Sequence, residues 1–150
     1  MAFDTLTAGP VEVVSGAAAI ATSSGETACA IIEGGEVLWG RGLEGQLGDG
    51  VSRDSATPVA VSELPPDVVQ VGVGVHYGCA RAASGEVWCW GGSEEDPCLP
   101  SQLPCSVGNA IVDLSVGSSS VCVVLACDEL RCLDYSAAPG EDGLIDLACG

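Results

Sequence analysis

Nine cysteines have the most obvious chemical potential in this 150-residue chain, because thiols can bind a metal, attack a substrate or form disulfides. Zinc sites are typically built from close pairs such as Cys-x2-Cys, often together with histidines. Here the closest cysteines, such as Cys122 and Cys127, are separated by four residues, and His76 is the sole histidine. We therefore predict no metal site.

Nucleophilic catalysis by a cysteine would have to use His76 as its base. This histidine stands next to Tyr77, on a stretch that we expect to be a turn between two strands. An imidazole in such a turn is far more often solvated or packed than catalytic. We predict no catalytic residue and expect that the chain is not an enzyme.

Two further motifs resemble ligand sites only in part. The acidic stretches 94–96 and 141–142 lack the Asp-x-Asp-x-Asp-Gly order of a calcium loop and are interpreted as solvated loops. The glycine-rich stretch 45–50 lacks the Lys-Ser/Thr of a phosphate-binding loop. We predict no cofactor.

The charge balance restricts the class of partner. The chain has 21 acidic and four basic residues, no lysine and a formal charge of −17. Such a surface repels nucleic acid, which is bound by clustered Lys and Arg, and also anionic lipid. A protein partner with a basic surface and a salt-sensitive rate of association is expected instead.

No stretch is typical of a membrane span or a signal peptide. The longest uncharged stretch, 97–112, contains three prolines, and a spanning helix needs about 20 mostly apolar residues. The first four residues contain no Lys or Arg, so no basic n-region is visible.

An internal repeat is the strongest signal in the chain. Pro-x-x-Val recurs at residues 10, 58 and 104, and each copy is followed by short apolar runs with a cysteine in the second run. The runs are 19–21, 68–74 and 111–117, then those carrying Cys29, Cys79 and Cys122, then 37–40, 87–91 and 130–134. Val, Ile, Cys and Trp between Gly, Pro, Asp and Ser indicate strands joined by turns.

Four strands in roughly 45 to 50 residues is the size of a propeller blade. We therefore predict an all-β fold of β-propeller blades, each of four antiparallel strands. The chain is expected to be one repeat domain over residues 1–150. The predicted blades are 10–57, 58–103 and 104–143, with a partial strand at 144–150.

The repeats resemble a known family. The stretch Trp39 to Gly50 reads WGRGLEGQLGDG, is followed by Pro58-Val59, and is similar to the signature of the regulator of chromosome condensation repeat family. Residues 71–80 and 85–91 resemble the other half of that repeat. The second and third units lack the Gly-Gln-Leu-Gly loop, and Thr27, Tyr77 and Ser120 stand where the family often has histidine.

The resemblance implies a β-propeller, which in this family is usually closed by seven blades. Seven blades need about 350 residues, so this chain is expected to hold about three blades of a partial ring. It is either a fragment of a longer ring or an open arc that other copies or a partner complete. The stretch 45–50 is then a turn that locks one blade to the next.

Alignment of the repeats predicts two disulfides. Cys79 and Cys89 occupy the same positions as Cys122 and Cys132, ten residues apart on neighbouring strands of a hairpin. Opposed residues of an antiparallel pair can lie about 4.5 Å apart at Cα, within disulfide reach.

The other cysteines are assigned from their places in the repeat. Cys98 and Cys105 flank the loop that replaces the missing motif, and we predict a disulfide that closes it. Cys29, Cys127 and Cys149 remain, and an odd count leaves one free or linked to another chain; Cys29 is expected to be a buried thiol.

Disulfides predict an oxidising, extracytoplasmic compartment: outside the cell, at its surface or in an organelle lumen. The alternative is nine reduced, buried cysteines in a cytosolic propeller.

The sequence thus favours a non-catalytic module for protein interaction or assembly, including self-association that completes the arc. A second hypothesis is a structural subunit whose open blade edges pack into a larger lumenal or cell-surface complex. A third, implied by some members of the family, is nucleotide exchange on a small GTPase. Less than half a ring and the predicted disulfides argue against the third.

Overall fold

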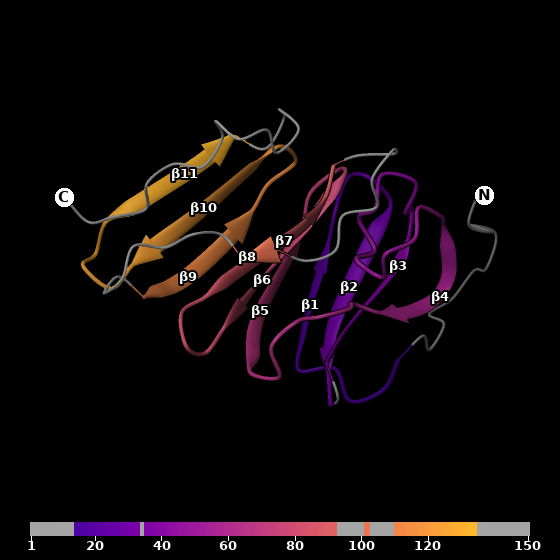
Figure 1. Cartoon of the computed structure of the whole chain (residues 1–150), viewed down its shortest axis with the longest axis horizontal. Coiled ribbons are helices and arrows are strands. Elements are labelled where there is room, and N and C mark those ends of the chain that lie inside the picture. Colours follow the sequence, from indigo (N-terminus) through magenta and orange to yellow (C-terminus); the bar gives the residue numbers. More distant parts are fainter. Residues whose placement is uncertain (1–13, 34, 93–100, 103–109, 135–150) are drawn as a thin grey trace.

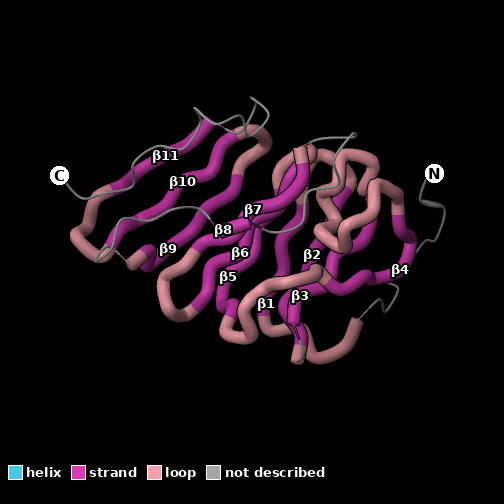
Figure 2. Tube along the Cα trace, viewed as in Figure 1, coloured by secondary structure: helices cyan, strands magenta, loops and turns pink. Residues whose placement is uncertain are grey.

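The computed structural model describes residues 14–33, 35–92, 101–102 and 110–134. Every helix or strand in this part is a β-strand, and Figure 2 shows no helix in it. The strands are β1 (Ala19–Thr22), β2 (Thr27–Ile32), β3 (Gly35–Gly40), β4 (Ser55–Ala60), β5 (Val68–Val73), β6 (Tyr77–Ala82), β7 (Val87–Gly91), β8 (Ser101–Gln102), β9 (Ile111–Val116), β10 (Ser120–Leu125) and β11 (Leu130–Asp134). No helix in the described ranges is long and apolar enough to cross a membrane.

The strands form three antiparallel sheets in chain order. The first sheet runs β1-β2-β3-β4, the second β5-β6-β7-β8, and the third, in its described part, β9-β10-β11. Figure 1 shows the sheets side by side, with the first near the N-terminal end and the third near the C-terminal end. The predicted all-β architecture of antiparallel blades in an arc that does not close is confirmed.

Alternation along the strands gives each sheet two apolar faces. On β10, Val121, Val123 and Leu125 are buried against the second sheet, whereas the residues between them lie on the opposite face. Because successive side chains point to opposite faces of a strand, each blade can pack against two neighbours. The sheets therefore stack face to face.

The approximate blade boundary drawn at residues 57/58 lies a few residues before the end of the first sheet. The division between residues 57 and 58 falls inside β4, which pairs with β3 and completes the first sheet. Pro58 fits there because β4 is an edge strand, and a proline at an edge removes no hydrogen bond from the interior of a sheet. The copy of Pro-x-x-Val at residue 58 thus lies at the end of the first blade instead of at the start of the second.

Two apolar cores fill the junctions between sheets. The first contains Leu38, Leu47 and Trp90, and the second contains Val121 and the pair Cys79–Cys89. A glycine permits the close approach at the second junction, since a Cβ on Gly72 would lie 2.5 Å from the Val116 side chain. Packing between blades thus buries apolar side chains on both faces of the second sheet.

Candidate interaction surface

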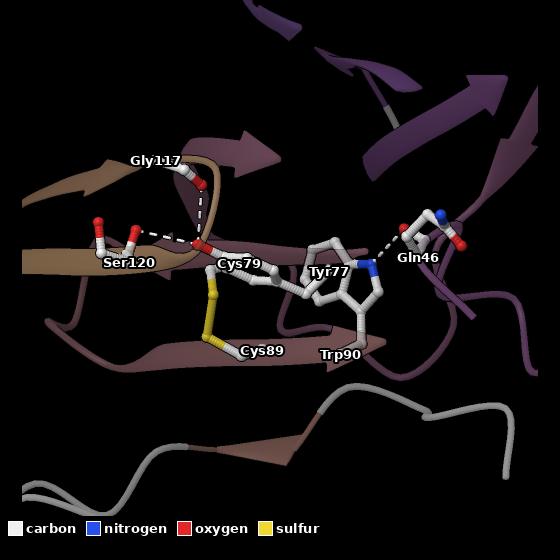
Figure 3. Close-up of a disulfide and its surroundings, with 7 residues drawn as sticks. All are labelled: Gln46, Tyr77, Cys79, Cys89, Trp90, Gly117 and Ser120. Atoms are coloured by element: carbon white, nitrogen blue, oxygen red, sulfur yellow. Dashed lines mark hydrogen bonds between the residues drawn. A yellow bond between two sulfur atoms is a disulfide. The ribbon is translucent and has the colours of Figure 1, made fainter. Parts of the chain in front are cut away.

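The cysteines predicted to pair on the hairpins lie at disulfide distance. Cys79 and Cys89 are directly opposed on β6 and β7, with an S–S distance of 2.09 Å. Cys122 and Cys132 are opposed on β10 and β11, with an S–S distance of 2.05 Å. The first disulfide lies in the core between the second and third sheets (Figure 3).

Cys29 is a free thiol in the first junction and only 1% exposed. Burial raises the pKa of Cys29 to about 12, with a smaller contribution from the nearby Glu36 carboxylate. A thiol that is buried and protonated is a poor nucleophile. Cys29 is therefore a core residue, as the alignment predicts, and is not accessible for a bond to another chain.

Cys127, one of the three cysteines that the sequence left unassigned, is disulfide-bonded. It is exposed on the turn between β10 and β11, where it can reach a neighbouring segment. Its bonding partner, and the predicted sites Cys98, Cys105 and Cys149, lie outside the described residues.

The glycine-rich loop joins the first blade to the second, as the resemblance implies. The indole N–H of Trp90 donates a hydrogen bond of 2.8 Å to the carbonyl oxygen of Gln46 (Figure 3). The backbone N–H of Gly92 donates to the carbonyl of Glu44 at 2.9 Å. Gly48 has a φ of 68° and leaves no room for a Cβ beside Trp90. The loop therefore needs glycine for both its conformation and its packing.

Glu44 organises the charged side of this loop. Its carboxylate accepts hydrogen bonds of 2.8 Å from both Arg41 Nη2 and Gln46 Nε2. Partial burial by itself raises the pKa of Glu44, but the Arg41 and Gln46 hydrogen bonds and the Arg41 charge outweigh it and lower the pKa to about 2. His76 Nδ1 lies 3.6 Å from the same carboxylate.

A buried aromatic side chain that sequence reasoning missed helps to close the second junction. The hydroxyl of Tyr77 donates to carbonyl oxygens of the third blade, lying 2.8 Å from that of Gly117 and 2.9 Å from that of Ser120 (Figure 3). The ring is only 2% exposed. Its one sequence signal was that it stands where the family often has histidine.

A second contact also crosses this junction, near its inner strands. Arg81 donates to Gln70 and to the carbonyl of Ile111, and Gln70 in turn donates to the carboxylate of Asp113 at 2.6 Å. The Gln70 hydrogen bond, with burial opposing it, lowers the pKa of Asp113. These contacts link β5 and β6 to β9.

The described residues bring no candidate catalytic set together. His76 is half exposed and faces Glu44, whose carboxylate is already bound by Arg41 and Gln46. Within the described ranges, no group of three or more His, Cys, Asp or Glu is placed to hold a metal ion. In this part of the chain, polar side chains such as Trp90, Tyr77 and Gln70 instead join neighbouring blades.

Comparison with known proteins agrees with the repeat geometry. Residues 36–81 match the sequence model for the regulator of chromosome condensation (RCC1) repeat. The chain carries an RCC1 repeat. The resemblance drawn from Trp39 to Gly50 is thereby confirmed, and the matched region includes the inter-blade loop and the Tyr77 strand.

Two curated relatives contain RCC1 repeats. The mouse E3 ubiquitin-protein ligase HERC2 is 32% identical over 162 residues, which cover 87% of this chain and 3% of the ligase. The ultraviolet-B receptor UVR8 of Arabidopsis thaliana is 32% identical over 134 residues, covering 79% of this chain and 29% of the receptor. The chain thus spans less than a third of either relative.

Solved structures show the same fold. Human WBSCR16 superposes with a TM-score of 0.69 at 19% identity, covering 81% of this chain and 34% of that one. Prp20p from Saccharomyces cerevisiae superposes with a TM-score of 0.66 at 21% identity, covering 77% of this chain and 31% of Prp20p. The blades of this chain therefore have a β-propeller-type fold.

The outer face of the third blade is the most prominent candidate surface. We define this outer face as Cys122, Val124, Leu130 and Cys132, which the β10–β11 register places on one side, away from the second sheet. Leu130 is 64% exposed, and Cys132 is exposed as well. In the first two blades the equivalent positions, such as Cys29 and Cys79, are buried against the next blade.

The opposite end of the arc presents the complementary half of such a junction. Ile20 and Trp39 lie on the face of the first sheet that points away from the second, and Ile20 is 75% exposed. A hollow of about 250 Å³ lies beside Trp39. Trp39 is equivalent to Trp90, which meets the loop of the preceding blade.

Proposed function

We propose that this chain is a non-catalytic protein-interaction module that assembles through the two end faces of its arc. The outer face of the third blade in one copy packs against the outer face of the first blade in the next. The contact is head-to-tail, like the two junctions within the chain, and such contacts give rings or open chains.

One observation carries this proposal: the outer face of the third blade has the same positions that the first two blades bury against a neighbour, yet Leu130 is 64% exposed. An apolar sheet face in water is a driving force for association, since burial contributes about 25 cal/mol per Å². The neighbouring structure Prp20p, described by its binding to Gsp1p and histones, supports a protein-binding role for this kind of propeller.

Sedimentation velocity over a concentration series tests the proposal. Wild-type protein should associate as its concentration rises, and Leu130→Glu should stay monomeric because it places a charge on the outer face. Val69→Glu is the matched control, because Val69 is 44% exposed but lies on β5, away from both end faces. A wild-type chain that is monomeric at all concentrations, or association that survives Leu130→Glu, would overturn the proposal.

We also propose that the module works in an oxidising compartment. Support comes from Cys79–Cys89 and Cys122–Cys132, each opposed at disulfide distance. Protein isolated from its native cells under thiol-blocking conditions should carry no blocking group on these four cysteines. Blocking groups on all four would place the chain in a reducing compartment.

A further inference from the structure

A cavity of about 470 Å³ lies where the first blade crosses to the second. Its walls come from the β2–β3 hairpin and from the segment that connects β4 to β5, and they include Val61, Pro65 and Pro66. Three glutamates, Glu33, Glu36 and Glu63, also line it. The cavity thus combines apolar walls with acidic groups, and it lies away from the outer face of the third blade.

Glu36 is the unusual member of this lining. It is only 5% exposed, and its β3 position opposite Ile31 turns its side chain toward the second sheet. Burial raises the pKa of Glu36, with its own backbone N–H opposing the effect. A buried carboxylate is normally paired with a cation, because desolvation of an unpaired charge is costly.

The chain itself provides no side chain to pair with Glu36. Lysine is absent, and the segments that the structure does not describe contain no Arg, Lys or His. The four arginines have other partners: Arg41 with Glu44, Arg53 with Asp49, Arg131 with Glu129, and Arg81 with Gln70. His76 lies against Glu44, so apart from the amine of Met1, a cationic partner for the ionised form of Glu36 can only come from another molecule.

The placement of the glutamates and the apolar wall of the cavity indicate which kind of cation fits it. The described residues include no group of three carboxylates placed to hold a metal ion, so Glu33, Glu36 and Glu63 do not converge on one point. Prolines and valine line the remaining wall, which suits an aliphatic stem. Lysine and arginine carry their charge on such stems, which bury well along apolar surface.

We infer that this cavity binds a lysine or arginine side chain of a partner protein, with its stem against Val61, Pro65 and Pro66 and its charge on Glu36. The net charge of −17 favours approach of a basic partner. This second surface agrees with an interaction role but does not depend on the end faces, so either proposal can fail alone.

Titration with short peptides, followed by amide NMR, tests the inference. The peptides are acetyl-Gly-Ala-Lys-Ala-Gly-amide, its arginine twin, and a norleucine twin that keeps the stem without the charge. The titration uses Leu130→Glu protein, whose cavity is intact whatever the outcome of the assembly experiment. The two basic peptides should shift the amides of Gly35, Glu36 and Val61, and the norleucine peptide should not.

Matched variants identify the carboxylate that matters. Glu36→Gln should lower the affinity of the protein for the lysine peptide by about tenfold or more, as expected for loss of a charged hydrogen bond. Asp128→Asn removes the same charge from an exposed turn of the third blade, where asparagine tolerates the φ of 63°, and should change the affinity less than about twofold. A thermal melt of each variant verifies folding.

Several results would overturn the inference. If Glu36→Gln and Asp128→Asn lower the affinity for the lysine peptide equally, only the overall charge attracts the peptide. If the norleucine peptide shifts the same amides as much as the basic peptides do, the cavity binds apolar stems without recognising their charge. Displacement of the lysine peptide by calcium or magnesium chloride, beyond the effect of sodium chloride at equal ionic strength, would make the cavity a metal site. Absence of any shift would remove the site.

Discussion

The two junctions of the arc pack similar sheet faces together but are closed in different ways. At the first junction, the backbone of a glycine-rich loop reaches the next blade, where Trp90 donates to the carbonyl of Gln46. At the second, Tyr77 of the middle blade donates to backbone carbonyls of the third. At both junctions an aromatic side chain of the middle blade donates to a backbone carbonyl. The acceptor lies in a loop of the earlier blade at the first junction and at the β9–β10 turn of the later blade at the second.

This difference shows which part of a junction varies within the chain. Sheet packing is retained at both junctions, since equivalent positions such as Cys29 and Cys79 are buried in each. The closing hydrogen bonds differ, and the second junction forms without the Gly-Gln-Leu-Gly loop of the first. A blade that departs from the repeat signature can therefore still dock.

The largest expected effect is at the first junction. Trp90→Ala should lower the free energy of unfolding by about 3–5 kcal/mol, because a fully buried indole is lost. Trp39→Ala, at the equivalent but partly exposed position of the first blade, should cost less than half as much. Urea denaturation measures both. Equal losses would mean that coverage by a preceding blade does not matter.

The second junction should respond to a smaller change. Tyr77→Phe should lower the free energy of unfolding by about 1–2 kcal/mol, because the carbonyls of Gly117 and Ser120 lose a hydrogen-bond donor. Hydrogen exchange should increase around residues 117–120. Thr27→Val is the comparison at the equivalent position of the first blade, where the hydroxyl donates to Arg41 within its own blade. Unchanged exchange at 117–120 in Tyr77→Phe would contradict a closing role.

The smallest effect concerns pH at the first junction. Because the pKa of Glu44 is lowered to about 2 in the folded state, its contribution is present above the usual glutamate pKa and is lost as pH falls from about 4.5 toward 2. We expect Glu44 to contribute about 1 kcal/mol to the free energy of unfolding, since its partner Arg41 is substantially exposed and solvent screens the pair.

The Glu44 effect is measured as the difference in stability between wild type and Glu44→Gln at several pH values, so that the other carboxylates cancel. The groups that face Glu44 are Arg41, Gln46 and His76. The difference should shrink as the pH falls below about 4.5. A difference that is constant down to pH 2 would show that Glu44 keeps an ordinary pKa.

Much of the fold could be predicted because each blade is local. The runs 68–74, 111–117 and 87–91 contain or coincide with β5, β9 and β7. Alternation of apolar residues and turn residues fixes such strands without information from distant parts of the chain. The approximate blade boundary at 57/58 falls inside β4 because a repeat can be divided at more than one point, and only pairing with β3 assigns β4 to the first sheet.

The contacts between blades could not be predicted to the same extent. The Tyr77 hydroxyl donates to carbonyl groups 40 and 43 residues away in the sequence, and no local sequence pattern predicts such a distant contact. Glu36 reads as an ordinary polar residue of a hairpin, and only the packing of the second sheet buries it. The bond of Cys127 likewise depends on which segment passes its turn. Where the loop signature is present, at 45–50, the contact was predicted correctly.

The most direct test of head-to-tail assembly mixes two variants that each lack one end face. Ile20→Glu and Leu130→Glu should each be monomeric alone in native mass spectrometry. Mixed, they should form a dimer and no larger species, because the intact outer face of the third blade in one variant can pack against the intact first blade of the other. A mixture that stays monomeric while the wild type associates, or either variant that associates alone, would contradict the account.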